Sequence, residues 1–170
     1  MRRPGADPDD FRAFVAASAG QLYRSACLLA GGDTHLAEDL VQEAFGRVYQ
    51  RWSKVVHLDN PVGYAQTTLV NTFISTRRKR SNHERPGLEA VDAAAPDTDP
   101  TLRLSLLAAL RQLTPKDRAV LVLRYWEDRS VEETAAALNL SPSAVRSRCG
   151  RALARVRDIL GADFAVLAHS

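Results

Sequence analysis

The sequence predicts an all-α protein of two small helical domains joined by a flexible linker. Apolar residues recur at helical spacing in two separate stretches, and cap residues or proline stand where helices would begin. The segment between the two stretches has neither feature. At 170 residues the chain is long enough for two such domains, each with a modest core.

The N-terminal stretch contains three helical patterns. Gly31 follows the first of them, at the place where glycine commonly ends a helix. Asp33 or Thr34 can cap the second, and Asn60-Pro61 is a cap followed by proline at the first helical position. We therefore expect helices over residues 9–30, 34–52 and 61–80.

The composition changes between the two halves of the chain. Residues 84–100 hold three prolines, an alanine run and an excess of acidic residues, without an apolar period. This composition is typical of a flexible linker. We assign residues 8–83 to the first domain, 84–100 to the linker, 101–160 to the second domain and 161–170 to a C-terminal tail.

The second domain ends in a pair of helices. Ser130 and Glu133 have the spacing of a capping box, and Ser141-Pro142 begins a longer helix after a short turn. This is the layout of a helix-turn-helix. On the longer helix, apolar side chains share one face and donors cover the rest: Ser143, Arg146, Ser147, Arg148, Arg151 and Arg155.

This outward face suits the major groove of DNA. An arginine can bridge guanine in a bidentate contact worth about 1–3 kcal/mol of discrimination, and flanking arginines bind phosphate. A solvated helix surface is the alternative. The arginines have no acidic residue one turn further along until Asp158, which favours DNA.

Two polar faces stand out in the first domain. The second helix exposes Asp39, Gln42, Glu43 and Gly46, which indicates either a basic protein partner or an ordinary solvated surface, with nothing in the residues to decide. The third helix presents an aromatic ring, hydroxyls and an amide before a basic cluster at residues 77–80. Such a face suits unpaired bases, although a basic helix end is also favoured by the helix dipole.

Taken together, these motifs resemble the extracytoplasmic-function sigma factors, and within them the actinobacterial SigE-like group. The resemblance rests on the runs at residues 37–45, 61–80, 113–121 and 144–148. It covers roughly residues 9–160, in the order found in the family, with a linker of the expected character.

The resemblance implies a factor that binds core RNA polymerase and directs promoter-specific initiation through sigma domains 2 and 4. Polymerase contacts are expected on the β′ clamp helices and the β flap, from Asp39, Gln42, Glu43, Gly46, Leu121 and Tyr125. The −35 duplex would be read by the six residues of the helix-turn-helix face. The melted −10 strand would contact His57, Asp59, Asn60, Tyr64, Thr67, Asn71, Ser75, Arg77, Arg78 and Arg80.

Other classes of protein are disfavoured. No nucleophile–base set, phosphate-binding glycine loop or metal-ligand cluster is visible, so we expect no enzyme activity, no cofactor and no metal. No signal sequence or membrane span is apparent, so we expect a cytoplasmic monomer, with an anti-sigma factor as a candidate partner. The main alternative is a helix-turn-helix regulator that acts without core polymerase.

Overall fold

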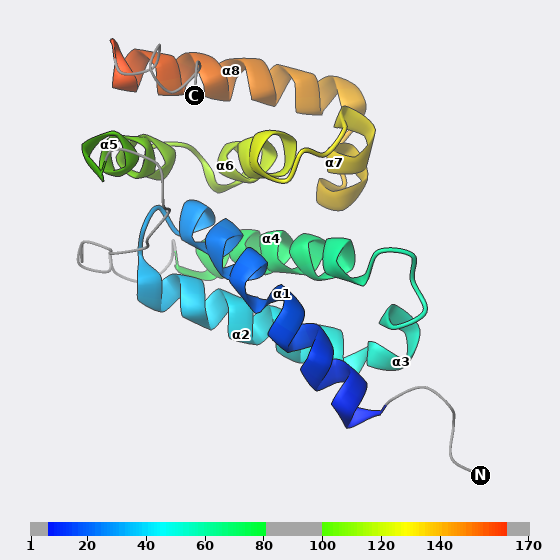
Figure 1. Cartoon of the computed structure of the whole chain (residues 1–170). Coiled ribbons are helices and arrows are strands. Elements are labelled where there is room, and N and C mark those ends of the chain that lie inside the picture. Colours follow the sequence, from blue (N-terminus) through cyan, green and yellow to red (C-terminus); the bar gives the residue numbers. More distant parts are fainter. Residues whose placement is uncertain (1–6, 81–99, 163–170) are drawn as a thin grey trace.

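The computed structural model describes residues 7–80 and 100–162, and within these ranges every regular element is a helix. The helices form two layers, α1–α4 in one and α5–α8 in the other (Figure 1). We call these the N-terminal layer and the C-terminal layer. Their elements are α1 (Pro8–Leu29), α2 (Thr34–Gln50), α3 (Trp52–Val55), α4 (Pro61–Arg80), α5 (Pro100–Arg111), α6 (Pro115–Leu121), the π-helical segment η1 (Val122–Trp126), α7 (Val131–Leu138) and α8 (Pro142–Leu160).

The predicted helix starts are confirmed. The side chain of Asp33 accepts the Leu36 amide at 3.1 Å, which makes Asp33 rather than Thr34 the cap of α2. The Asn60 side chain accepts the Gly63 amide at 2.9 Å in front of α4. Each cap satisfies a backbone donor that the first turn of a helix leaves unpaired.

Part of the segment between the second and third predicted helices is itself helical. α2 ends at Gln50, and Trp52–Val55 form the short helix α3. Trp52 is 4% exposed and Val55 is 1% exposed, so burial of these two side chains holds the segment in a helical turn. The residues that follow it, around His57 and Asp59, form an exposed turn.

The turn after α1 requires a glycine for two reasons. Gly31 has a φ of +62°, a conformation that residues with a side chain rarely adopt. A Cβ at this position would also lie 2.1 Å from Cγ of Arg111, at the end of α5. The turn that ends α1 is therefore also a place where the C-terminal layer approaches closely.

Helix α4 is buried on two sides. It packs on α1 and α2 within its own layer and on α6 and α7 of the other. One face of this helix is apolar and fully buried, since Ala65, Leu69 and Phe73 have no exposed surface. Val70 and Thr72 lie outside that face and are equally buried. The buried residues of both layers consequently form one continuous core.

The most deeply buried charge in the described residues joins the two layers. Arg118 of α6 is 1% exposed and its guanidinium donates to the Leu29 carbonyl at 2.6 Å and to those of Arg111 and Leu113 at 3.1 and 3.2 Å. It lies 5.4 Å from the centre of the Phe73 ring. Leu29 ends α1, so the cation sits at the negative end of that helix.

The environment of Arg118 leaves the side chain charged. Burial, and then the neighbouring charges of Arg77 and Arg111, lower its pKa to about 10. A pKa of about 10 still keeps the guanidinium protonated at neutral pH. Carbonyl oxygens and an aromatic face therefore compensate a full positive charge in the interior.

Replacing Arg118 tests this contact. We expect Arg118→Ala to lower the free energy of unfolding by about 3 kcal/mol, because three carbonyls lose a charged donor. Urea denaturation followed by circular dichroism measures the change. Arg118→Lys is the charge-matched control and should recover only part of the loss, since one ammonium cannot reproduce the planar guanidinium. A loss below about 1 kcal/mol, the net worth of one ordinary hydrogen bond, would contradict the assignment.

Candidate nucleic-acid interface and partner surfaces

The helix-turn-helix predicted in the second domain is formed by α7, a turn and α8. Ser130 and Glu133 make both hydrogen bonds of the capping box, at 3.0 and 3.2 Å. Asn139 ends α7 in the left-handed conformation with a φ of 54°. Ser141 then caps α8 by accepting the Ala144 amide at 3.1 Å. Local side-chain chemistry therefore fixes both helix starts and the turn between them.

The outer face of α8 is as predicted, with one exception. Val145, Cys149 and Ala152 are buried. Arg148 is partly buried and its Nη1 lies 2.8 Å from Oδ1 of Asp117 on α6. This side chain therefore holds α8 against α6. The other predicted readers are exposed: Ser143, Arg146, Ser147, Arg151 and Arg155.

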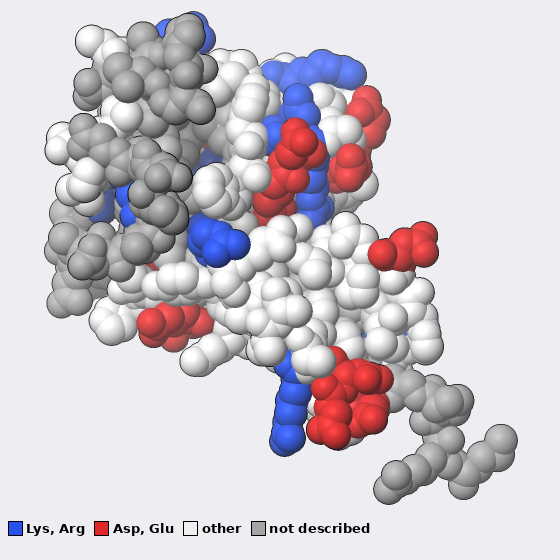
Figure 2. Space-filling view, in the orientation of Figure 1, with Lys and Arg blue, Asp and Glu red and all other residues white. Residues whose placement is uncertain are grey.

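Charge of both signs gathers around the start of α8. In Figure 2, Lys and Arg atoms alternate with Asp and Glu atoms near α7 and the adjoining end of α8, above a wide uncharged surface. Arg146 Nη2 lies 3.7 Å from Glu132 Oε1, and both side chains are largely exposed. An exposed pair of this kind is worth little, so Arg146 can exchange its partner for another anion.

The acidic-polar face of α2 is fully accessible. Asp39, Gln42, Glu43 and Gly46 are all exposed. Glu43 pairs with Arg47 at 2.8 Å within the same helix. A Cβ on Gly46 would meet nothing within 4 Å, so the surface here is open. We call these four exposed residues the α2 stripe.

A polar pocket of about 370 Å³ lies between α2 and α4. The sequence pointed to Tyr64 and Asn71, which both line it. Arg47 and Arg51 also line it and were not predicted as site residues, because their approach to α4 depends on how the two helices pack. Two guanidinium groups, a phenol and amide groups converge here: Arg47, Gln50, Arg51, Tyr64, Thr68 and Asn71.

The remaining residues predicted for the −10 strand are spread over the N-terminal layer. His57, Asp59 and Asn60 are exposed in the turn before α4. Arg78 is exposed near the end of that helix, whereas Ser75 and Arg77 are half-buried. The side chain of Arg80 lies outside the described residues. Of the residues predicted for the −10 strand, Tyr64 and Asn71 therefore line the pocket, whereas the other described ones lie elsewhere along α4 or in the turn before it.

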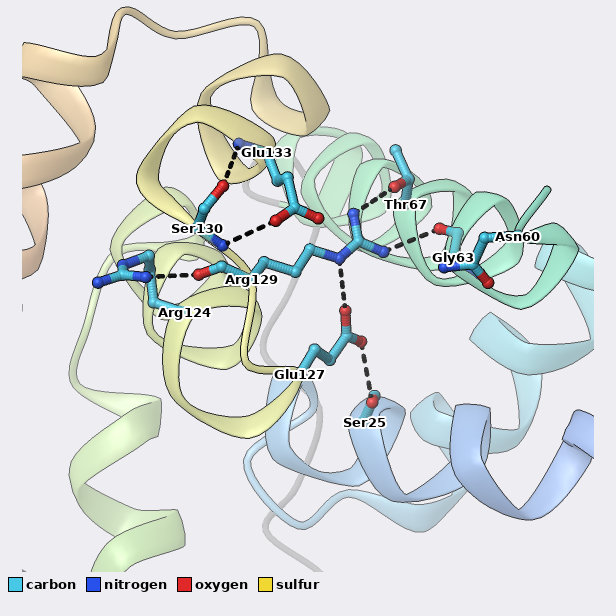
Figure 3. Close-up of polar contacts among 9 residues, drawn as sticks. All are labelled: Ser25, Asn60, Gly63, Thr67, Arg124, Glu127, Arg129, Ser130 and Glu133. Carbon is cyan, nitrogen blue, oxygen red and sulfur yellow. Dashed lines mark hydrogen bonds and ion pairs between the residues drawn. The ribbon is translucent and has the colours of Figure 1, made fainter. Parts of the chain in front are cut away.

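Thr67 and Asn71 have partners that the sequence did not predict. Figure 3 shows the partner of Thr67. Arg129 donates to Oγ1 of Thr67 and to the carbonyl of Gly63, both at 2.8 Å. Asn71 donates from Nδ2 to the Ala137 carbonyl at 3.1 Å. Arg129 and Ala137 belong to the C-terminal layer. The face of α4 next to the polar pocket is therefore hydrogen-bonded to the C-terminal layer.

The same contact extends to α1 through a buried carboxylate. Glu127 Oε2 lies 3.4 Å from Nε of Arg129, and Ser25 donates to Glu127 Oε1 at 3.0 Å. Burial raises the pKa of Glu127, although Arg129 and then Ser25 act in the opposite direction. We call Ser25, Gly63, Thr67, Glu127 and Arg129 the Arg129 cluster.

An apolar groove of about 300 Å³ lies mainly on the C-terminal layer. Tyr125 and Trp126 are 58% and 50% exposed at its edge. Leu121 lines the same groove, so the two residues predicted to contact polymerase from this layer lie together. Leu28 of α1 also contributes to the wall, so the groove reaches the other layer.

Among residues 7–80 and 100–162, no three His, Cys, Asp or Glu side chains are grouped as a metal site. Cys27 and Cys149 are both buried and unpaired with each other. None of the helices in the described part of the chain is long and apolar enough to cross a membrane.

Comparison with known proteins assigns both layers to one family. The family models described as Sigma-70 region 2 and Sigma-70, region 4 match residues 14–83 and 103–156. The RNA polymerase sigma-E factor of Streptomyces avermitilis is 38% identical over 153 residues, which cover 89% of this chain and 85% of that protein. The ECF RNA polymerase sigma factor SigE of Mycolicibacterium smegmatis is 33% identical over 165 residues, covering 92% and 63%.

A solved structure has the same fold. The sigma factor RpoE from Bartonella quintana, in complex with the anti-sigma factor NepR, matches with a TM-score of 0.75 at 24% sequence identity. The match covers 91% of this chain and 98% of that one.

The capping box before α7 gives a pH-dependent prediction. The Ser130 backbone amide and hydroxyl group hydrogen-bond with Glu133 and lower its pKa from 4.5. A lowered pKa in the folded state means that the carboxylate stabilises the helix above pH 4.5 and loses this effect as the pH falls. We expect Ser130→Ala to raise the pKa of Glu133 only part of the way toward its ordinary value, because the hydroxyl group is lost while the backbone amide, the larger cause, remains. NMR titration measures the change, and an unchanged pKa would show that the Ser130 hydroxyl group has no part in lowering it.

Proposed function

We propose that this chain, which belongs to the extracytoplasmic-function RNA polymerase sigma factors of the sigma-70 family, selects promoters by two separate DNA contacts. Proteins of this family serve transcription initiation and are not catalysts by themselves. One contact reads the −35 duplex and the other captures the melted −10 non-template strand. The observation that carries this proposal is that an exposed arginine face on α8 occurs together with a polar pocket of about 370 Å³ on the other layer.

The −35 contact is proposed for the outer face of α8. Ser143, Arg146 and Ser147 stand exposed in its first half, as side chains must to reach base edges in the major groove. Arg151 and Arg155 continue the face and suit phosphate contacts, which add affinity without sequence information. Arg148 is proposed only as a phosphate contact, since Asp117 already holds it.

The −10 contact is proposed for the polar pocket and the turn before α4. A flipped base needs a stacking surface and edge hydrogen bonds, which Tyr64 and Asn71 can supply. Arg47 and Arg51 line the same pocket, where they suit the adjoining phosphates. Stacking is worth about 1–3 kcal/mol per base, comparable with the cost of unstacking one from a duplex.

The polymerase contacts are proposed for two surfaces. The exposed α2 stripe fits a basic partner such as the β′ clamp helices. The apolar groove, with Tyr125 at its edge, fits an apolar segment such as the β flap. Leu121 would meet that segment from inside the groove.

Further proposals concern the domains and a protein partner. We keep residues 8–83 and 101–160 as the two DNA-contacting domains and 161–170 as the tail. The linker predicted over residues 84–100 ends one residue earlier, because Pro100 already belongs to α5. Residues 84–99 of the linker and 163–170 of the tail lie outside the described residues. An anti-sigma factor is a proposed partner, since the structurally similar RpoE of Bartonella quintana forms a complex with one. The proposed site of action is the cytoplasm, where the promoter DNA is.

The competing function is a helix-turn-helix regulator that binds duplex DNA without polymerase. Such regulators bind as dimers to half-sites about 34 Å apart. Transcription by core polymerase reconstituted with the purified chain, followed by mapping of transcript starts on genomic DNA, separates the two. The proposal requires starts preceded by a shared pair of elements. Duplex binding by a dimer without any directed initiation would favour the regulator.

Arg146→Ala tests the −35 contact. We expect about a tenfold loss of initiation at the preferred −35 sequence, since one bidentate base contact is worth about 1–3 kcal/mol. The difference in initiation between the wild-type chain and the variant should become smaller on a promoter in which the −35 base that faces this residue has been substituted. Arg24→Ala removes the same charge from an exposed position on α1 and serves as the control. If both variants keep the wild-type promoter preference, Arg146 does not read a base.

Asp39→Arg tests the α2 stripe. We expect it to weaken association with core polymerase by more than tenfold, because a like charge would face a basic partner. Affinity measured by fluorescence anisotropy, with circular dichroism to check folding, gives the comparison. Asp10→Arg makes the same charge change at an exposed position on α1. Equal affinity for the Asp39 and Asp10 variants would exclude the stripe from docking.

A further inference from the structure

The C-terminal tail carries an apolar segment that the proposed DNA and polymerase contacts leave unused. Three large apolar side chains fall within four positions: Phe164, Val166 and Leu167. The Sigma-70, region 4 model ends at residue 156, so these side chains lie beyond the family match. We call residues 164–167 the tail segment. They lie outside the described residues, whereas the end of α8 and the turn that follows it are described up to Ala162.

Helix α8 ends in a turn that favours reversal of the chain. Gly161 has a φ of 55° and a ψ of −123°, and its amide donates to the Arg157 carbonyl at 2.9 Å. These angles are those of the first central residue of a type II′ turn, a position that favours glycine. A Cβ on Gly161 would meet nothing within 4 Å, so glycine serves the backbone conformation here and not the packing. The backbone at Gly161 therefore turns the chain away from the helix axis.

The tail segment is within reach of the apolar groove. Leu160, the last residue of α8, lines the groove, and so do Val156 and Leu153 one and two turns before it. Phe164 follows Leu160 by only four positions. Helix α8 rises about 10 Å from Leu153 to Leu160. Seven residues of extended chain span roughly twice that distance, so a chain that turns back after α8 can lay the tail segment along the groove.

The groove has a lining that matches the tail segment. It lies where the end of α8 runs beside α5 (Figure 1), and all the side chains that line it are apolar or aromatic. Tyr125 and Trp126 expose about half of their surface at its edge. Exposed apolar surface of this kind is stabilised by contact with another apolar group. The tail segment supplies apolar side chains and carries no charge.

We propose that the tail segment docks in the apolar groove of its own chain. The groove is then an interaction surface whose occupant in the free protein is residues 164–167. Docking itself does not depend on what else the groove binds. The consequence for polymerase does, since it rests on the proposed contact of the groove with the β flap.

A weak contact is enough for this docking, because the connection is short. Three residues, 161–163, separate the groove residue Leu160 from the tail segment. A short tether keeps its segment at an effective concentration in the millimolar range. At about 1 mM, a segment with a dissociation constant of about 0.1 mM covers its site in roughly nine molecules of ten. The segment therefore needs no affinity beyond that of a few apolar side chains.

Docking lowers the affinity of the free chain for other partners of the groove. The apparent affinity falls in proportion to the fraction of molecules in which the groove is free. The β flap would have to displace the tail segment before it meets Leu121 and Tyr125. The tail segment thus sets how favourable the flap contact must be, and it covers aromatic surface in the free chain.

A spin label on the tail tests docking in the full chain. Ser170→Cys carries the label, while the native Cys27 and Cys149 are buried. In methyl NMR spectra recorded without DNA or polymerase, we expect the label to broaden the signals of the groove residues Leu121 and Leu153. The signals of Leu40, which is buried in the N-terminal layer, should stay sharp.

Two matched variants show whether the apolar side chains hold the tail. Phe164→Ser with Leu167→Ser should weaken the broadening severalfold, because the segment loses its two largest apolar side chains. Ala165→Ser with Ala168→Ser adds the same polar groups to the tail and should leave the broadening intact. Circular dichroism checks that both chains keep their helices. Equal broadening in the two double variants would overturn the proposal.

A mixed sample separates docking within one chain from docking between chains. It combines spin-labelled chain without isotope labels and methyl-labelled chain without a spin label. Docking within one chain predicts sharp signals for Leu121 and Leu153 in this sample. Broadening as strong as in the singly labelled chain would show that the segment binds a second copy, and would overturn the intramolecular arrangement.

Affinity for core RNA polymerase tests the competition. Measured by isothermal titration calorimetry, the chain with Phe164→Ser and Leu167→Ser should bind core polymerase about tenfold more tightly than the Ala165 and Ala168 double variant, because its groove is free in nearly every molecule. Equal or weaker affinity would overturn the competition and would count against the β-flap contact of the groove. Docking seen by NMR would stand in that case, so the two failures can be told apart.

Discussion

The fold depends on two arginines that carry positive charge from one layer into the other. Arg118 places its guanidinium on the carbonyl that ends α1, and Arg129 places its own on α4. Burying a charged donor is costly unless it finds acceptors. The relative position of the two layers is therefore fixed by carbonyl and hydroxyl groups at defined places as well as by apolar contact.

This constraint explains the composition of α4. The helix must bury Leu69 and Phe73 against its own layer, accept hydrogen bonds at Gly63 and Thr67 from the other, and still line a polar pocket with Tyr64. A helix with these three demands cannot show a simple apolar stripe.

The parts of the structure that local chemistry determines were predictable from the sequence. Caps such as Asp33 and Ser130, the exposed side of α8 and the open α2 stripe all follow from residues within a few positions of one another. Contacts between distant segments were not predictable. Arg129 reaches Thr67 across more than sixty positions, and Arg148 turns from the predicted DNA face to Asp117. For the same reason, Tyr64 and Asn71 were predicted as site residues of the polar pocket and Arg47 was not, since Arg47 approaches Tyr64 only when α2 packs on α4.

Arg118 and Arg129 fix the relative position of the two layers. The most direct measurement is the distance between spin labels on α1 and α8 of the full chain, recorded by pulsed electron paramagnetic resonance in the wild type and in the double variant Arg118→Ala and Arg129→Gln, with circular dichroism to check that the helices remain. We expect a narrow distance distribution in the wild-type chain and a broad one in the double variant. An equally narrow distribution in the helical double variant would contradict the account, because the layers would then stay in place without the two arginines.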